Sequence, residues 1–195
     1  LVKLNTWDLV IDIASNDGSL LKAYGDQWYE LLWVDPTSKK FSQYYPSYVE
    51  YISDFFSAEI VQEKTQKKAK IITSISMLYD LPHPLEFVKH IKEILDDDWV
   101  RLFEQSYLPS MIDMVSYDTI CHEHLEYYSL KQINRMIEHV WMKIIDVVLN
   151  DVNWWSFQVL VSKDTSRVAN QENIEKLLKH EKVGGYNSLE IFESF

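Results

Sequence analysis

Residues 117–128 hold an unusual density of groups that can accept or donate protons. The segment contains two histidines and three carboxylates, among them His122, Glu123 and His124. An imidazole titrates near neutral pH, and a neighbouring carboxylate can orient the ring or stabilise its charge. In an extended segment His122 and His124 would share one face and Glu123 would point to the other. The segment is therefore a candidate for general acid–base catalysis.

Three other interpretations of this segment stay open. A metal site is one, although His-Glu-His lacks the spacing of the helical zinc motif and no third ligand is evident. Cys121 beside a histidine could form a thiol nucleophile, and the segment could also be a purely structural polar loop. Cys121 is the single cysteine of the chain, which excludes an internal disulfide and a cysteine-rich zinc site within it.

A second group of polar residues follows the first apolar run of the chain. That run ends at Asp12-Ile13 and leads into the loop 14–18, Ala-Ser-Asn-Asp-Gly. In doubly wound sheets, ligands bind beyond the carboxyl ends of the strands, and Gly18 would allow backbone to approach a ligand closely. Asp12 is placed to pair with an ammonium group. The G-x-G-x-x-G pattern is absent, and an Asx-type turn is the structural alternative.

Further carboxylates end two other strand-like runs. Asp35 precedes Pro36 and follows Gly18 at roughly the ~20-residue spacing of ribose-binding carboxylates. A helix N-cap or a turn aspartate is the alternative for Asp35. Glu104 and Gln105 end a later run, where they could line a substrate pocket or simply close a strand.

Alternating strand and helix patterns must position these groups. Strands separated by helices predict parallel βαβ units, and the last two strands are close enough to form a hairpin. We therefore predict an α/β fold with a mostly parallel seven-stranded sheet, an antiparallel edge and helices on both faces. The expected strands are 9–13, 29–34, 50–52, 70–74, 100–104, 143–149 and 157–161, and the expected helices are 19–24, 58–68, 85–95, 130–139 and 173–182.

Composition narrows the classes of function. The net charge of −11 argues against nucleic acid as a partner, since an acidic surface repels phosphates. No apolar run is long enough for a membrane helix, and no secretory signal is evident, so we expect no membrane partner and a cytoplasmic location. We expect a core over residues 1–163 and a linker with a helix over 164–195, leading toward a further C-terminal domain. The oligomeric state is not indicated.

Two motifs resemble those of the S-adenosylmethionine-dependent nucleotide-sugar C-methyltransferases. Residues 12–18 resemble the family's [E/D]-I-[A/G]-S-N-D-G cofactor motif. Residues 118–130 resemble its D-T-I-x-H-E-H-L-x-Y-[F/Y]-S-L active-site segment. Weaker agreement around 33–36 and 156–159 extends the similarity over residues 8–162.

The resemblance implies a Rossmann-like class I methyltransferase core, with S-adenosylmethionine as cofactor and a nucleotide-linked keto-deoxysugar as substrate in deoxysugar biosynthesis. His124 matches the family's base, which removes the proton alpha to the ketone, and Glu123 matches the neighbouring catalytic carboxylate. No metal is expected. The expected cofactor contacts are Asp12, Ala14, Ser15, Asn16, Gly18, Asp35 and Pro36, and the expected substrate contacts are His122, Cys121, Tyr127, Glu104, Gln105 and Asn153.

The chain departs from the family at several positions. Cys121 replaces a tyrosine, and Trp33, Trp154 and Trp155 stand where the family has glycine. Large rings at such positions could block a ligand or distort a turn. The family's cysteine-rich zinc domain and most of its C-terminal domain have no counterpart here. Two alternatives therefore stay open: an O- or N-methyltransferase for another small molecule, and a catalytically inactive cofactor-binding or interaction module.

Overall fold

A single seven-stranded sheet organises the computed structural model, which describes residues 3–25, 28–151, 156–193 and 195. The sheet order is β3-β2-β1-β4-β5-β7-β6. β7 runs antiparallel to both β5 and β6, and the other neighbouring strands pair in parallel. The predicted α/β fold with an antiparallel edge is confirmed. The strands are β1 (Leu9–Ile13), β2 (Glu30–Val34), β3 (Val49–Ile52), β4 (Ala69–Ile75), β5 (Leu95–Ser106), β6 (Lys143–Leu149) and β7 (Ser156–Ser162).

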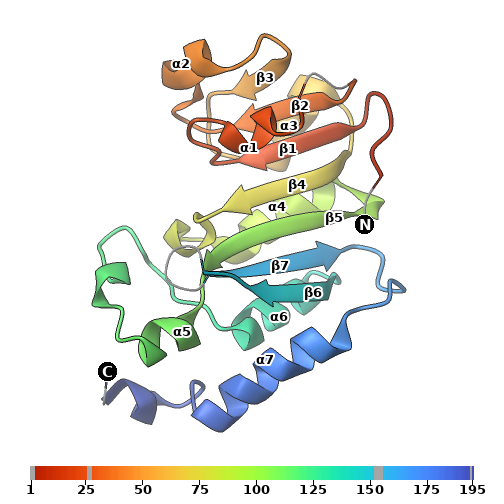
Figure 1. The fold of residues 1–195 in the computed structure, drawn as a ribbon. Helices are drawn as coiled ribbons and strands as arrows, with labels where there is room; N and C mark the ends of the chain where they lie inside the picture. Colours follow the sequence, from red (N-terminus) through yellow and green to blue (C-terminus); the bar gives the residue numbers. More distant parts are fainter. Residues whose placement is uncertain (1–2, 26–27, 152–155, 194) are drawn as a thin grey trace.

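Helices cover the two faces of the sheet unequally (Figure 1). The larger apolar core joins one face to α3, α4, α6 and α7, whereas α1 packs its Leu21 against Val10 and Trp33 on the other face. No helix in the described part of the chain is both long and apolar enough to cross a membrane. The helices are α1 (Ser19–Lys22), α2 (Ser38–Phe41), α3 (Ala58–Thr65), α4 (Pro84–Ile94), α5 (Leu108–Asp113), α6 (Leu130–His139) and α7 (Gln171–Gly184).

β1 shows why the central strands can be recognised in the sequence. All five of its residues are buried, because β2 and β4 flank it and helices cover both of its faces. Buried parallel strands accordingly appear as continuous apolar runs. Asp12 is the exception within this run, and a buried carboxylate in a central strand needs a particular reason.

Glu181 on α7 is a buried carboxylate that joins this helix to the start of α6. It accepts hydrogen bonds from Tyr107 Oη at 2.8 Å, Leu130 N at 2.6 Å and Lys131 N at 3.1 Å. The first N–H groups of a helix lack partners within the helix, and an anion satisfies them well. Part of the segment 164–195, which we predict to be a linker and helix, thus packs on the sheet domain. The boundary at residue 163 stays a prediction.

Replacing Glu181 by alanine is expected to lower the free energy of unfolding by about 2–4 kcal/mol, because three donors, two of them buried, lose their acceptor. Urea denaturation at pH 7 measures the change. Glu175→Ala, at an exposed position of the same helix, is the matched control and should stay within about 0.5 kcal/mol of the parent chain. Equal effects of the two substitutions would show that the buried hydrogen bonds contribute nothing.

Candidate active site

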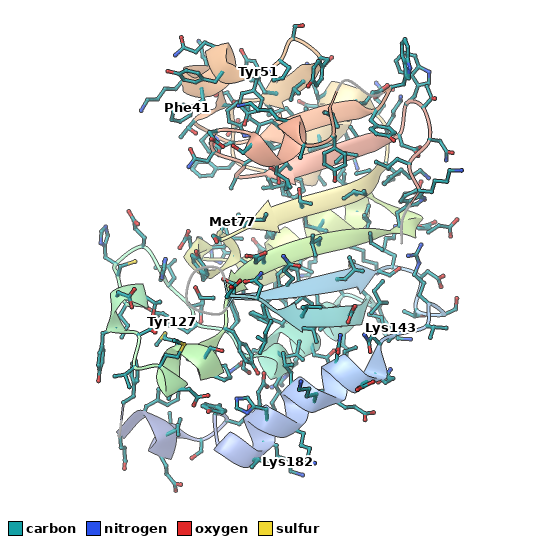
Figure 2. The ribbon with its side chains drawn as sticks, viewed as in Figure 1. Phe41, Tyr51, Met77, Tyr127, Lys143 and Lys182 are labelled. Atoms are coloured by element: carbon teal, nitrogen blue, oxygen red, sulfur yellow. The ribbon has the colours of Figure 1, made fainter. Side chains whose placement is uncertain are left out.

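The predicted site residues gather at one edge of the sheet. In Figure 1 the arrowheads of β1, β2, β4 and β5 point to the same side, so the loops that follow these strands lie together there. Met77, just after β4, and Tyr127, in the loop before α6, lie toward this side in Figure 2. This carboxyl edge is where open α/β sheets bind their ligands.

The loop after β1 is tight and needs glycine at its end. Ala14, Asn16 and Gly18 all have left-handed backbone, with φ of 57°, 51° and 68°. A Cβ on Gly18 would lie 1.8 Å from the Tyr45 ring, so a side chain cannot be accommodated there. The Tyr45 hydroxyl lies 3.3 Å from the Ser15 hydroxyl. Tyr45 was not predicted from the sequence as a site residue. The aromatic ring of Tyr45 therefore lies over the backbone of this loop.

Asp12 places a buried carboxylate beneath this loop. Its Oδ1 accepts a hydrogen bond from Thr73 Oγ1 on β4 at 2.5 Å. Burial raises the pKa of the Asp12 carboxyl to about 7; the hydrogen bonds from Thr73 and Ser15 lower it, and the charge of Asp35 raises it. Asp12 takes part in none of the ion pairs of the described residues. A cation of suitable size would relieve this cost.

The pKa of Asp12 predicts a pH-dependent stability. The carboxyl titrates near 3.8 ordinarily and at about 7 in the fold, so its contribution to stability is full below pH 4 and is lost as pH rises through 7. The asparagine of Asp12→Asn cannot ionise. The free energy of unfolding of this variant is therefore expected to be higher than that of the parent chain, by roughly 4 kcal/mol at most, at pH 8. Urea denaturation of both chains at pH 4, 6 and 8 measures the difference; parallel profiles would contradict it.

Asp35 ties the end of β2 to the loop after β1. Its Oδ1 accepts hydrogen bonds from both the backbone N and the hydroxyl of Thr37 at 2.6 Å, and its Oδ2 accepts one from Asn16 N at 3.3 Å. The adjacent Pro36 is exposed, and its carbonyl accepts a hydrogen bond from Ser53. The structure thus brings two of the predicted acidic residues, Asp12 and Asp35, to the same edge of neighbouring strands.

His124 is held in a defined orientation on the other side of this edge. Its Nδ1 lies 2.7 Å from the carbonyl oxygen of Thr119. A carbonyl oxygen can only accept, so Nδ1 carries the proton and Nε2 of the neutral ring keeps its lone pair. The ring also packs against Tyr79, with centroids 4.2 Å apart. His124 therefore presents a base-competent nitrogen. It lines a narrow cavity with Tyr79, Ser106, Leu108, Met111, Glu126, Tyr127 and Tyr128.

Tyr79 and Asp80, in the loop after β4, were not predicted as site residues. The carbonyl of Tyr79 accepts hydrogen bonds from Leu125 N at 2.9 Å and Glu126 N at 3.1 Å, which fixes the backbone next to His124. Burial raises the pKa of Asp80; the charge of His124 lowers it. Asp80 thus interacts electrostatically with His124 from a distant part of the chain, and no sequence motif marks it.

The remaining predicted residues lie in different surroundings. His122 and Glu123 are exposed and approach each other at 4.0 Å, whereas Cys121 is half-buried. Tyr127 donates to the Thr119 carbonyl at 3.4 Å, beside His124. Among the described residues, no group of three histidine, cysteine or acidic side chains is placed to hold a metal ion.

Glu104 and Gln105 lie just before the last residue of β5, at the same edge of the sheet. Glu104 accepts a hydrogen bond from Gln158 Nε2 at 2.6 Å. The side-chain amide of Gln105 is buried and has no hydrogen-bond partner within the described residues. An unpartnered buried amide is costly unless a ligand or water completes it. Asn153, the last predicted substrate contact, lies outside the described residues.

Comparisons with known proteins assign the chain to a family and support its fold. Residues 4–140 match the profile of the Methyltransferase domain family, to which this chain belongs. It is 24% identical to the C-methyltransferase NovU of Streptomyces niveus over the whole chain, but spans 47% of NovU. A methyltransferase from Aquifex aeolicus shares the fold with a TM-score of 0.58 and 14% identity, over 80% of this chain and 84% of that one.

A complex of LepI with S-adenosylmethionine also shares the fold, with a TM-score of 0.64 and 15% identity over 80% of this chain and 43% of LepI. These likenesses show that the chain has the fold of class I methyltransferases. The carboxylates at the edge of its sheet fit S-adenosylmethionine as a ligand. Asp12 is a buried carboxylate without an ion-pair partner among the described residues, suited to the ammonium, and Asp35 offers acceptors to a ribose diol.

Proposed function

We propose that this chain is the transferring core of a C-methyltransferase that acts on a nucleotide-linked keto-deoxysugar, with His124 as the base. The observation that carries the proposal is the orientation of His124, whose Nδ1 is occupied by the Thr119 carbonyl while Nε2 remains able to accept a proton. The likeness to NovU, which is named a C-methyltransferase, supports carbon as the acceptor. Because the chain spans about half of NovU, the activity of the whole protein is part of the proposal.

The reaction needs a base because a carbon acceptor is not nucleophilic until it loses a proton. His124 Nε2 takes the proton from the carbon alpha to the ketone, and the electron pair of that C–H bond forms an enolate. The enolate carbon then forms a bond to the methyl group as the methyl–sulfur bond breaks. S-adenosylmethionine supplies the methyl group in a sulfonium, which makes it transferable. The protein's contribution is to hold the base beside the acceptor carbon, and that carbon in line with the methyl–sulfur bond.

The neighbours of His124 receive supporting roles in this proposal. Glu123 is assigned as a carboxylate that stabilises the protonated imidazole from the solvent side. Tyr127 shares the Thr119 carbonyl with His124 and would help to fix the ring. Substrate contacts are proposed for His122, Cys121, Glu104, Gln105 and Asn153, and Ala14, Ser15, Asn16, Gly18 and Pro36 join Asp12 and Asp35 around the cofactor. We propose a cytoplasmic location and expect neither nucleic acid nor membrane as a partner.

Proton exchange separates carbon methylation from the alternatives. The chain is incubated in D2O with a nucleotide-linked 4-keto-deoxysugar and S-adenosylhomocysteine, and deuterium at the alpha carbon is followed by NMR. Exchange that depends on the protein, together with a new carbon–methyl bond when S-adenosylmethionine is supplied, is expected. Methylation on oxygen or nitrogen without alpha exchange would replace this function by that of an O- or N-methyltransferase. If the chain catalyses neither exchange nor methylation, the proposed function is overturned.

A further inference from the structure

The chain has an unusual ratio of tryptophan to glycine. It contains seven tryptophans and four glycines in 195 residues, whereas average usage of about 7% would give about fourteen glycines. Trp7, Trp28 and Trp141 are 61%, 73% and 80% exposed. Tryptophan is normally a highly buried residue.

Trp141 occupies a glycine position at the end of α6. The backbone N–H of Trp141 donates to Glu138 O at 2.9 Å, and that of Met142 donates to Ile137 O at 3.1 Å. These two bonds define a Schellman motif, whose residue after the C-cap adopts left-handed backbone and is usually glycine. Trp141 has φ of 58°, as the motif requires. A Cβ in this conformation lies too close to the following carbonyl oxygen and strains the backbone.

Trp7 occupies a second glycine position, in the turn before β1. Asp8 N donates to Asn5 O at 3.2 Å, which closes a four-residue turn with Trp7 in its third place. Trp7 has φ of 69°, whereas Thr6 is not among the residues with positive φ. A turn with positive φ only at the third residue is a type II turn, and that residue is normally glycine.

Trp33 fills space at the cofactor edge. Its side chain is fully buried on β2, and its indole Nε1 has no hydrogen-bond partner within the described residues. The indole stacks on Tyr45 with ring centroids 3.9 Å apart. That stack places the Tyr45 ring where a Cβ of Gly18 would lie, directly over the loop after β1. Without a side chain at position 33, Tyr45 has no stacking partner there and the loop is less covered.

We infer that positions 7 and 141 are built for glycine, and that the source cell inserts glycine at all seven tryptophan positions of this chain. The two sites differ in type, because one is a helix end and the other a turn, yet both have the left-handed backbone that favours a residue without a side chain. One decoding rule would account for both of them. Some cells read the triplet UGA as tryptophan and others read it as glycine, so a single reassigned triplet would exchange these two residues.

Peptide mass spectrometry of the protein isolated from its source cells tests the inference directly. Glycine masses are expected at positions 7, 28, 33, 99, 141, 154 and 155. Tryptophan masses at positions 7, 33 and 141 would overturn it. This measurement needs no activity, so its outcome is independent of the proposed methylation.

Thermal unfolding tests the backbone argument separately. Trp141→Gly and Trp7→Gly are each expected to raise Tm by about 2–4 °C, because the left-handed strain is removed. Trp141→Ala is the matched control: it removes the exposed ring but keeps a Cβ at φ of 58°, so its gain should be smaller. Equal gains for alanine and glycine, or no gain for either, would refute glycine-specific positions.

The cofactor edge gives a third readout. A chain with all seven tryptophans replaced by glycine is expected to bind S-adenosylhomocysteine about tenfold more tightly than the tryptophan form, because Tyr45 is no longer held over the loop. Unchanged or weaker binding by a folded chain would contradict the role given to Trp33. If neither form binds, the assignment of the cofactor edge fails, whereas the mass and melting tests still decide the glycine positions.

Discussion

Replacing His124 by glutamine is expected to lower the rate of carbon methylation by about 10²–10⁴-fold, the usual effect of removing a general base. Glutamine keeps a polar side chain of similar reach, but it cannot take up a proton at the position of Nε2. Alpha-proton exchange should fall by the same factor, whereas binding of S-adenosylhomocysteine should not change. Single-turnover assays and calorimetric titration measure the two effects.

Asp118→Asn is the control within the same segment. Asp118 is exposed and has no role in the proposed reaction, so its replacement should leave the rate nearly unchanged. A similar loss for both variants would point to a disturbed loop. Full activity in His124→Gln would exclude His124 as the base and would favour an acceptor that needs no carbon acidity.

Replacing Asp35 by alanine is expected to weaken binding of S-adenosylhomocysteine by about 10²-fold or more. Two hydrogen bonds from a ribose diol to a carboxylate are each worth about 1.5–3 kcal/mol. The same carboxylate also holds Asn16 N and both donors of Thr37, so its loss loosens the loop as well. Calorimetric titration measures the affinity, and circular dichroism verifies that the variant is folded.

Asp54→Ala provides the comparison for this measurement. Asp54 is an exposed carboxylate in the loop after β3, the next parallel strand of the sheet. Its removal changes the net charge by the same amount as Asp35→Ala, and its effect on affinity should be less than twofold. Equal losses would indicate long-range electrostatics, and an unaffected Asp35→Ala would remove Asp35 from the cofactor site.

The elements that could be predicted are those with strong local signals. β1 and α6 have the predicted bounds, because β1 is a short apolar run and α6 begins with a capping box between Ser129 and Gln132. β5 was predicted to start only at residue 100. It begins at Leu95, and Asp96 and Asp97 lie in the strand, where Lys70 pairs with Asp96 and Lys163 with Asp97. Such pairings join distant residues and leave no local pattern.

The candidate site likewise contains some residues that could be predicted from the sequence and others that could not. The positions of Asp12 and Asp35 could be predicted, because both end strands of a parallel sheet and topology brings such ends together. Tyr45 and Tyr79 could not, since each reaches the site from a loop without a recognisable motif. Glu123 is adjacent to His124 in sequence, yet its side chain is exposed and approaches His122. Adjacency in the chain also gave no sign of Asp80, whose carboxylate interacts electrostatically with His124 from a distant part of the chain.

The stretch from Thr73 to Tyr79 touches both halves of the proposed site. Thr73 donates its hydroxyl to Asp12 at the cofactor edge, and Tyr79 holds the backbone beside His124. A shift of β4 by one residue would turn Thr73 to the opposite face and displace Tyr79 at once. Methyl transfer is sensitive to misplacement of about 1 Å. Insertions or deletions within this stretch should therefore be far less tolerated than changes of side chain, so its length is itself under functional constraint.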